Sequence, residues 1–206
     1  MGVDYVEMDV RTTSDGKLVL LHDATVDRMT GAKGAIASMT LAEIRSLGLA
    51  KTGEKIPTFD EALEILRPAT RKTGVYLDAK NVSAADIVKA LRDQGMLERA
   101  VVYGGPKLLA EIKAYGPIPR IMPEAMSVNG VKKWVADLKP EVLAFDRNDW
   151  KDEVIAAARA AGVRDLFVDR LGADDTAEAW EDAVARGATG IQTDRPEDLL
   201  VWRGRV

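Results

Sequence analysis

Residues 4–10 of the chain read DYVEMDV, a run that alternates between apolar and polar side chains and predicts a β-strand. Successive side chains of a strand point to opposite faces, so Glu7 and Asp9 share one face and Met8 lies on the other. Two neighbouring carboxylates repel each other, and burial penalises both. A hard divalent metal ion with oxygen ligands would remove that cost, whereas a solvated face or an arginine partner is the plain alternative.

Two further polar features favour a functional site over scattered surface charge. His22, the only histidine in the chain, stands beside Asp23 at the end of a short apolar strand. Residues 75–80 repeat the alternation of the first strand and place Asp78 and Lys80 on one face. We expect these groups to act together with the first strand.

The composition of the chain limits the classes of function. Its 206 residues are 47% hydrophobic and 30% charged, which is ordinary for a globular protein with one sizeable core. A net charge of -4 argues against a nucleic-acid binder with a basic surface. The absence of cysteine excludes disulfides and thiolate ligands, and a single histidine makes a zinc site implausible. The chain has no apolar run of the ~20 residues that a membrane span needs.

Strands and helices are predicted to alternate along most of the chain. Thr40 and Thr58 each precede a glutamate by three residues, as in a capping box, Ser83 is a helix cap, and Pro106 suits a first helical position. The predicted strands are residues 4–10, 18–21, 75–79, 100–103, 120–122, 142–145, 166–168 and 190–192. The predicted helices are residues 40–47, 58–66, 83–94, 106–115, 127–138, 149–161, 174–185 and the segment from 196, which Asp194 is expected to cap. This rhythm predicts an α/β fold with a parallel sheet.

The polar side chains decide between a barrel and a doubly wound sheet. Nearly every predicted strand carries them at its carboxyl end, where a barrel gathers all strands around one rim. A doubly wound sheet would use mainly the strands at its switch point. The residues concerned are Glu7, Asp9, Asp78, Lys80, Tyr103, Asp146, Arg147, Asp169, Arg170, Thr193 and Asp194. We therefore predict a barrel with seven strands, with the short strand at 18–21 belonging to an excursion.

The chain resembles the glycerophosphodiester phosphodiesterase family over essentially its whole length. The matching segments are GVDYVEMDVRTTSDG at 2–16, LVLLHD at 18–23, VDRMT at 26–30, KG at 33–34, IPT at 56–58, LDAK at 77–80 and GIQTDRP at 190–196. The resemblance implies a TIM (β/α)8-type barrel, a single domain over residues 1–206. It also implies a small insertion, here roughly Val10 to Lys55.

The resemblance also implies a reaction and a role for each site residue. Glu7 and Asp9 match the metal-binding pair of the family, and Asp78 stands where a third metal carboxylate, often Glu, is usual. His22 matches one of two acid–base histidines, and Lys80 matches the basic residue that meets the phosphate, where we expect Arg11 to assist. The implied reaction is metal-dependent hydrolysis of small-molecule glycerophosphodiesters to glycerol 3-phosphate and an alcohol, with Mg²⁺ or Ca²⁺.

The chain departs from the family pattern at its beginning. Family members start with a strand that carries His-Arg and a loop that carries Glu-Asn, whereas this sequence begins at the second barrel strand. A truncated gene, a degenerate protein and completion by another chain are all open interpretations. Loss of one general acid or base costs about 10²–10⁴-fold, so we expect activity that is lost or lowered by orders of magnitude. An open edge between the strands at Val6 and Ile191 would favour a homo-oligomer.

Several alternatives stay open at this point. The chain could be a non-catalytic barrel that binds a phosphorylated ligand or a partner, or a different metal-dependent barrel enzyme acting on a phosphate ester or a sugar. Asp23 could orient His22 or cap the following turn, and Arg28 is expected mainly to hold the insertion loop. A cytoplasmic and a periplasmic or secreted location are both compatible, because any signal would lie upstream of Met1.

Overall fold

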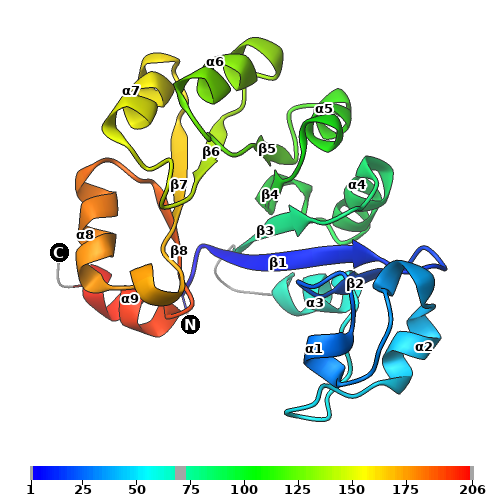
Figure 1. Cartoon of the computed structure of the whole chain (residues 1–206). Helices are drawn as coiled ribbons and strands as arrows, with labels where there is room; N and C mark the ends of the chain where they lie inside the picture. Colours follow the sequence, from blue (N-terminus) through cyan, green and yellow to red (C-terminus); the bar gives the residue numbers. More distant parts are fainter. Residues whose placement is uncertain (1, 68–72, 205–206) are drawn as a thin grey trace. The chain divides into compact units, whose positions relative to one another are not determined.

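The computed structural model describes residues 2–67 and 73–204 and divides the chain into two compact units. One unit is Tyr5–Gly104, and the other joins Met1–Asp4 to Gly105–Val206. Figure 1 labels the helices and strands of both units.

The strands of the first unit run in the order β2-β1-β3-β4 within a mixed sheet. The central pair, β1 (Tyr5–Thr12) and β3 (Gly74–Ala79), is parallel, and β3 is also parallel to β4 (Ala100–Tyr103). β2 (Leu18–Leu20) pairs antiparallel with the end of β1. This arrangement confirms the predicted strands and the predicted excursion.

A tight turn and a small subdomain follow β1. The backbone of Gly16 has a φ of 74°, which glycine adopts without strain, and the turn returns the chain into β2. The segment after β2 contains α1 (Asp27–Thr30), the 3₁₀ helix η1 (Ile36–Ser38) and α2 (Leu41–Ser46). Its own apolar core contains Val19, Leu21, Val26, Ile36, Ile44 and Ile56. The insertion therefore packs around buried side chains of its own.

The helices of the first unit begin at the predicted caps. Thr40 and Thr58 each form a complete capping box, at α2 and at α3 (Phe59–Leu66). The Ser83 hydroxyl accepts a hydrogen bond from the Asp86 main-chain N–H at the start of α4 (Ala84–Asp93). The 3₁₀ helix η2 (Leu97–Arg99) leads into β4. Each cap satisfies a main-chain donor that the helix itself cannot satisfy.

The second unit alternates strands and helices (Figure 1). Its strands are β5 (Arg120–Met122), β6 (Val142–Phe145), β7 (Asp165–Asp169) and β8 (Gly190–Gln192). Its helices are α5 (Pro106–Ala114), α6 (Val128–Asp137), α7 (Asp152–Ala160), the 3₁₀ helix η3 (Gly172–Asp174), α8 (Ala177–Ala185) and α9 (Pro196–Arg203). β6, β7 and β8 form a parallel three-stranded sheet. Phe145 and Trp150 pack edge to face, 5.1 Å apart, in the core of this unit.

Two helices of the second unit begin later than predicted. α7 begins at Asp152 rather than at 149, because the Asp149 carboxylate binds main-chain N–H groups of Met126 and Asp146. α8 begins at Ala177 rather than at 174, because Thr176 is the residue whose side chain caps it. Asp194 was expected to cap α9, and this was wrong. Arg195 precedes α9 without a side-chain cap, and the Asp194 carboxylate accepts a hydrogen bond from the Gly172 N–H.

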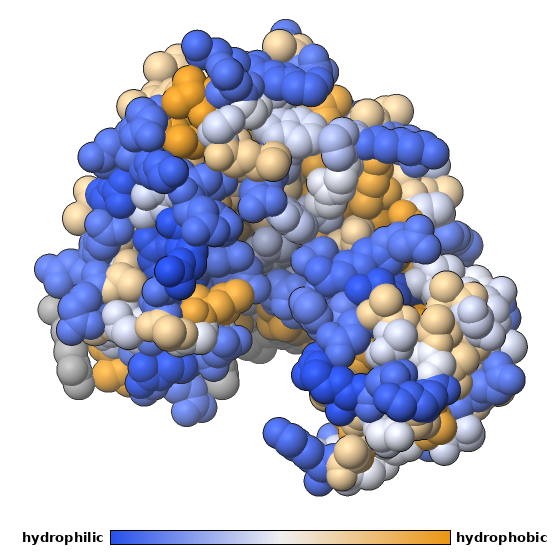
Figure 2. Space-filling model, in the orientation of Figure 1, coloured by the Kyte–Doolittle hydropathy of each residue, from blue (hydrophilic) through white to orange (hydrophobic). Residues whose placement is uncertain are grey.

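In the described part of the chain, seven strands remain when the antiparallel β2 is set aside, which agrees with the predicted number. Closure of these strands into one barrel domain stays a prediction. Hydrophilic side chains cover most of the face in Figure 2, and apolar ones form small separate patches. No helix among residues 2–67 and 73–204 is long and apolar enough to cross a membrane.

Candidate active site

The predicted carboxylates of β1 and β3 lie together. Asp9 pairs in register with Asp78 on the adjacent parallel strand, and Glu7 lies two residues before Asp9 on the same face. One carboxylate oxygen from each of the three lies within 4.8 Å of the others, and all three side chains are half-buried. We call Glu7, Asp9 and Asp78 the β1–β3 trio. Its donors are all oxygens, so it has the chemistry of a site for a hard divalent cation.

Lys80 faces two members of the β1–β3 trio. Its Nζ lies 2.7 Å from Asp78 Oδ2 and 3.1 Å from Asp9 Oδ1. Burial alone would lower the pKa of Lys80, but the hydrogen bonds and charges of Asp78 and Asp9 outweigh burial and raise it. Lys80 is therefore a stable cation, and its ammonium group faces two of the three carboxyl groups, those of Asp9 and Asp78.

His22 lies at the end of β2 with its imidazole 68% exposed. Its Nδ1 is 2.9 Å from Asp23 Oδ1. Arg28 donates from Nε to Asp23 Oδ2 at 2.7 Å and from Nη2 to Asp23 Oδ1 at 2.9 Å. These bonds from Arg28, and then the contact with His22, hold the pKa of the Asp23 carboxyl well below its usual range. Asp23 thus contacts the ring of His22, the first of the two roles that the sequence left open.

The main chain links His22 to the β1–β3 trio. The Leu21 N–H donates to the Asp9 carbonyl at 3.1 Å. Arg11, which lies on β1 two residues after Asp9, donates from Nε and Nη2 to the His22 carbonyl at 3.1 and 2.6 Å. Arg11 was expected to assist at the phosphate. In the described contacts, the Arg11 side chain instead stabilises the main chain at His22.

A second acidic group, in the other unit, was not predicted as a site. Oxygens of Glu124, Asp146 and Asp149 also lie within 4.8 Å of one another, and we call these residues the β6-end trio. Asp149 accepts hydrogen bonds from the N–H groups of Met126 at 2.6 Å and Asp146 at 2.8 Å. Asp146 accepts from the Asn148 and Asp149 N–H groups at 2.6 and 3.0 Å. These carboxylates stabilise the turns that follow β5 and β6.

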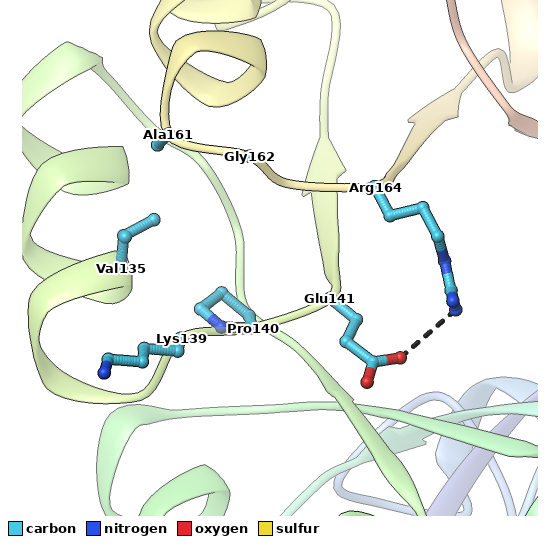
Figure 3. A pocket seen from close by; sticks show the side chains of 7 residues that line it. All are labelled: Val135, Lys139, Pro140, Glu141, Ala161, Gly162 and Arg164. Atoms are coloured by element: carbon cyan, nitrogen blue, oxygen red, sulfur yellow. Dashed lines mark hydrogen bonds and ion pairs between the residues drawn. The ribbon is translucent and has the colours of Figure 1, made fainter.

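The second unit also has an open groove at the amino ends of β6 and β7 (Figure 3). Its volume is ≈ 460 Å³, and Lys139, Glu141 and Arg164 supply its charged side chains. Arg164 Nη2 and Glu141 Oε2 pair at 3.1 Å. The charges of the groove are therefore partly matched to one another, and the groove lies at the strand ends opposite to those that carry the acidic groups of this unit.

Comparison with known proteins decides the family. Residues 1–114, more than half of the chain, match the model of the glycerophosphoryl diester phosphodiesterase family. The chain belongs to this family. A glycerophosphodiester phosphodiesterase from Caldanaerobacter subterraneus subsp. tengcongensis is a relative, 29% identical over 97% of this chain and 86% of its own length. Human glycerophosphodiester phosphodiesterase 1 is 43% identical over a shorter stretch, 30% of this chain and 21% of its own length.

Solved structures of family members have a similar fold. A glycerophosphodiester phosphodiesterase from Agrobacterium tumefaciens C58 has a TM-score of 0.77 and 27% identity, and the match covers 95% of this chain and 86% of that one. An Oleispira antarctica phosphodiesterase in complex with the product sn-glycerol-3-phosphate has a TM-score of 0.85 and 20% identity, with 98% and 86% covered. These neighbours confirm the predicted α/β class. The roles of the individual site residues stay predictions.

Proposed function

We propose that this chain is a metal-dependent phosphodiesterase that hydrolyses glycerophosphodiesters to glycerol 3-phosphate and an alcohol. The observation that carries the proposal is the convergence of the β1–β3 trio with Lys80, one main-chain hydrogen bond away from Leu21, the residue before His22. The family of the chain supports the reaction class, and its named relatives support a small-molecule substrate.

The donor set of the β1–β3 trio fits a divalent cation. Its three carboxylates are half-buried and converge within 4.8 Å, and the Lys80 ammonium faces two of them, Asp9 and Asp78. Oxygen-only donors suit Mg²⁺ and Ca²⁺, and the choice between them is part of the test. When bound, such an ion neutralises charge on the phosphoryl oxygens.

The side chains of this chain would share the remaining work. The Lys80 ammonium supplies a second positive charge to a phosphoryl oxygen, and its raised pKa keeps it protonated. His22 exposes its ring and uses Nδ1 toward Asp23, so Nε2 is the atom that would accept a proton from the nucleophile or donate one to the leaving alcohol. One imidazole performs one of these transfers at a time.

The deciding experiment is release of glycerol 3-phosphate from glycerophosphocholine and glycerophosphoethanolamine. It is run with Mg²⁺, with Ca²⁺ and with chelator, for the unchanged chain, Glu7→Gln and His22→Ala. Asp146→Asn, in the β6-end trio, is the matched control. We expect metal-dependent turnover that both site variants lose and the control retains. Turnover that persists in chelator or in Glu7→Gln would contradict the proposal.

A second candidate is a protein that binds a phosphorylated ligand or a partner without turnover. Among the described strands of its sheet, β8 lies at an edge and pairs with β7 alone. Strand edges with open hydrogen-bonding groups recruit other chains, so we propose a second copy of this chain as that partner. Light scattering measures the mass of the protein in solution. A monomer at all protein concentrations would exclude a second copy of the chain as the partner. Calorimetry with glycerol 3-phosphate would detect binding without turnover.

A further inference from the structure

Three side chains of the insertion form a continuous chain of hydrogen bonds that ends at the imidazole. Both Asp23 oxygens accept from the Arg28 guanidinium, at 2.7 and 2.9 Å. Asp23 Oδ1 also lies 2.9 Å from His22 Nδ1. A two-point contact between guanidinium and carboxylate fixes the plane of the carboxylate as well as its position.

A fixed carboxylate beside Nδ1 selects the tautomer of a neutral imidazole. An ionised carboxylate only accepts hydrogen bonds, so the ring must place its proton on Nδ1 to make this contact. Arg28 holds the pKa of Asp23 low, which keeps the acceptor ionised. Nε2 then carries a lone pair when the ring is neutral and a proton when the ring is charged.

We propose that Arg28 is a positioning residue that acts on His22 through Asp23 and sets both the tautomer and the orientation of the ring. The proposal rests on the proposed function for its catalytic consequence. The selection of the tautomer itself is a property of the chain alone. Arg28 touches no reacting atom in this account.

The insertion loop does not depend on Arg28 for its own bracing. The Asp27 carboxylate accepts from the Gly34 N–H at 3.1 Å and pairs with Lys33 at 2.9 Å. The Val26 N–H donates to the Gly34 carbonyl at 3.0 Å, and the Val26 side chain is fully buried. Both described hydrogen bonds of the Arg28 side chain go to Asp23. The prediction that Arg28 mainly holds the loop is therefore replaced by a role directed at His22.

In the described contacts, the charged side chains near His22 are those of Asp23, Arg28 and Arg11. Asp23 faces Nδ1, Arg28 lies behind Asp23, and Arg11 binds the main-chain carbonyl of His22 rather than its ring. Loss of Arg28 would therefore affect the tautomer and the orientation of the His22 ring through the Asp23 carboxylate. The matched control is Lys33→Ala, because Lys33 forms an ion pair of similar length in the same loop, is 85% exposed and contacts Asp27 instead of Asp23.

The test uses the fact that the chain has one histidine, so ¹⁵N-labelled protein yields one imidazole signal set. Two-bond ¹H–¹⁵N spectra at neutral pH assign the proton to Nδ1 or Nε2. We expect the Nδ1–H form in the unchanged chain, in Lys33→Ala and, in part, in Arg28→Lys. We expect Arg28→Ala to shift toward Nε2–H and Asp23→Ala to do so fully. An unchanged Nδ1–H signal in Arg28→Ala would overturn the proposal.

Turnover provides the second readout. With glycerophosphocholine as substrate we expect Arg28→Ala to lower kcat roughly 10-fold with little change in KM, at the lower end of what supporting partners contribute. Lys33→Ala should leave both constants unchanged. If the unchanged chain has no turnover but Arg28→Ala shifts the tautomer toward Nε2–H, the proposed function fails and the positioning role stands. Arg28→Lys separates a loss of positioning from a loss of fold. If this variant is folded and keeps the Nδ1–H tautomer in part, whereas Arg28→Ala loses it, the effect of Arg28→Ala comes from lost positioning of the ring.

Discussion

The β1–β3 trio and the β6-end trio meet the same geometric criterion, since in each the three carboxylates offer oxygens within 4.8 Å of one another. Their described partners differ. In the first, Asp9 and Asp78 face the ammonium of Lys80. In the second, Asp146 and Asp149 accept hydrogen bonds from main-chain N–H groups of the turns around them.

We propose that this difference separates a metal site from a set of carboxylates with a structural role. Carboxylates that accept main-chain N–H groups hold loops in shape, and a ligand would have to displace those bonds. Carboxylates that face a lysine side chain, as Asp9 and Asp78 do, can exchange that contact for a bound cation without loss of a main-chain hydrogen bond to the lysine. Proximity of acidic groups is therefore a weak criterion, and the identity of their partners is the stronger one. Four experiments test the contrast.

The largest expected effect is on turnover. Asp9→Asn should lower metal-dependent glycerol 3-phosphate release by more than about 100-fold, since even residues that only support a metal ligand contribute about 10–100-fold. Asp146→Asn makes the same chemical change in the β6-end trio and should leave turnover within a factor of about two. Equal losses in the two variants would erase the distinction between the trios.

The second effect is on stability in the presence of metal. A cation that binds only the folded chain at 100 times its Kd adds about 2.7 kcal/mol, which is a rise in Tm of about 5–10 °C for a chain of this size. Calorimetry with Mg²⁺ and with Ca²⁺ should show this rise for the unchanged chain and for Asp146→Asn. Glu7→Gln should show little of it. A rise that needs Asp146 and not Glu7 would assign the cation to the other trio.

The third effect concerns Lys80. Lys80→Met keeps the length of the side chain and removes the ammonium that faces Asp9 and Asp78. In chelator the free energy of unfolding should fall by about 1–2 kcal/mol, because the carboxylates then face one another without their cation. Mg²⁺ should restore most of the loss. Urea unfolding with and without Mg²⁺ measures both values, and a loss that Mg²⁺ leaves unchanged would contradict the account.

The smallest effect is the pH dependence of Asp149, whose side chain is 4% exposed. Burial, and then the charges of Asp146 and Glu124, raise its pKa to about 6 against the lowering effect of its hydrogen bonds. A raised folded pKa means that its contribution to stability is complete below the unfolded value of 3.8 and is lost as the pH rises through about 6. Between pH 4 and 7, the free energy of unfolding of Asp149→Asn should therefore fall by about 1 kcal/mol less than that of the unchanged chain. Asp137→Asn, at an exposed ion pair with Lys133, is the control and should keep the wild-type slope.

Much of the local structure was predictable from residues near one another in sequence. The capping boxes at Thr40 and Thr58 and the cap at Ser83 were all confirmed. Each depends on groups no more than four residues apart, so the amino-acid types alone specify it. Gathering of the β1–β3 trio was also predictable, since strand alternation and parallel pairing place these residues on one face.

The partners of the polar groups were decided by the tertiary structure. The Asp149 carboxylate binds the Met126 N–H, 23 residues away, and so it does not begin α7 as its position suggested. Arg11 was expected at the phosphate and binds the carbonyl of His22, because the register of β1 against β2 brings that carbonyl within its reach. Sequence therefore specified which side chains carry chemistry and which local elements form. Only the folded chain decided which donor reaches each acceptor, because those distances depend on strand register and loop path.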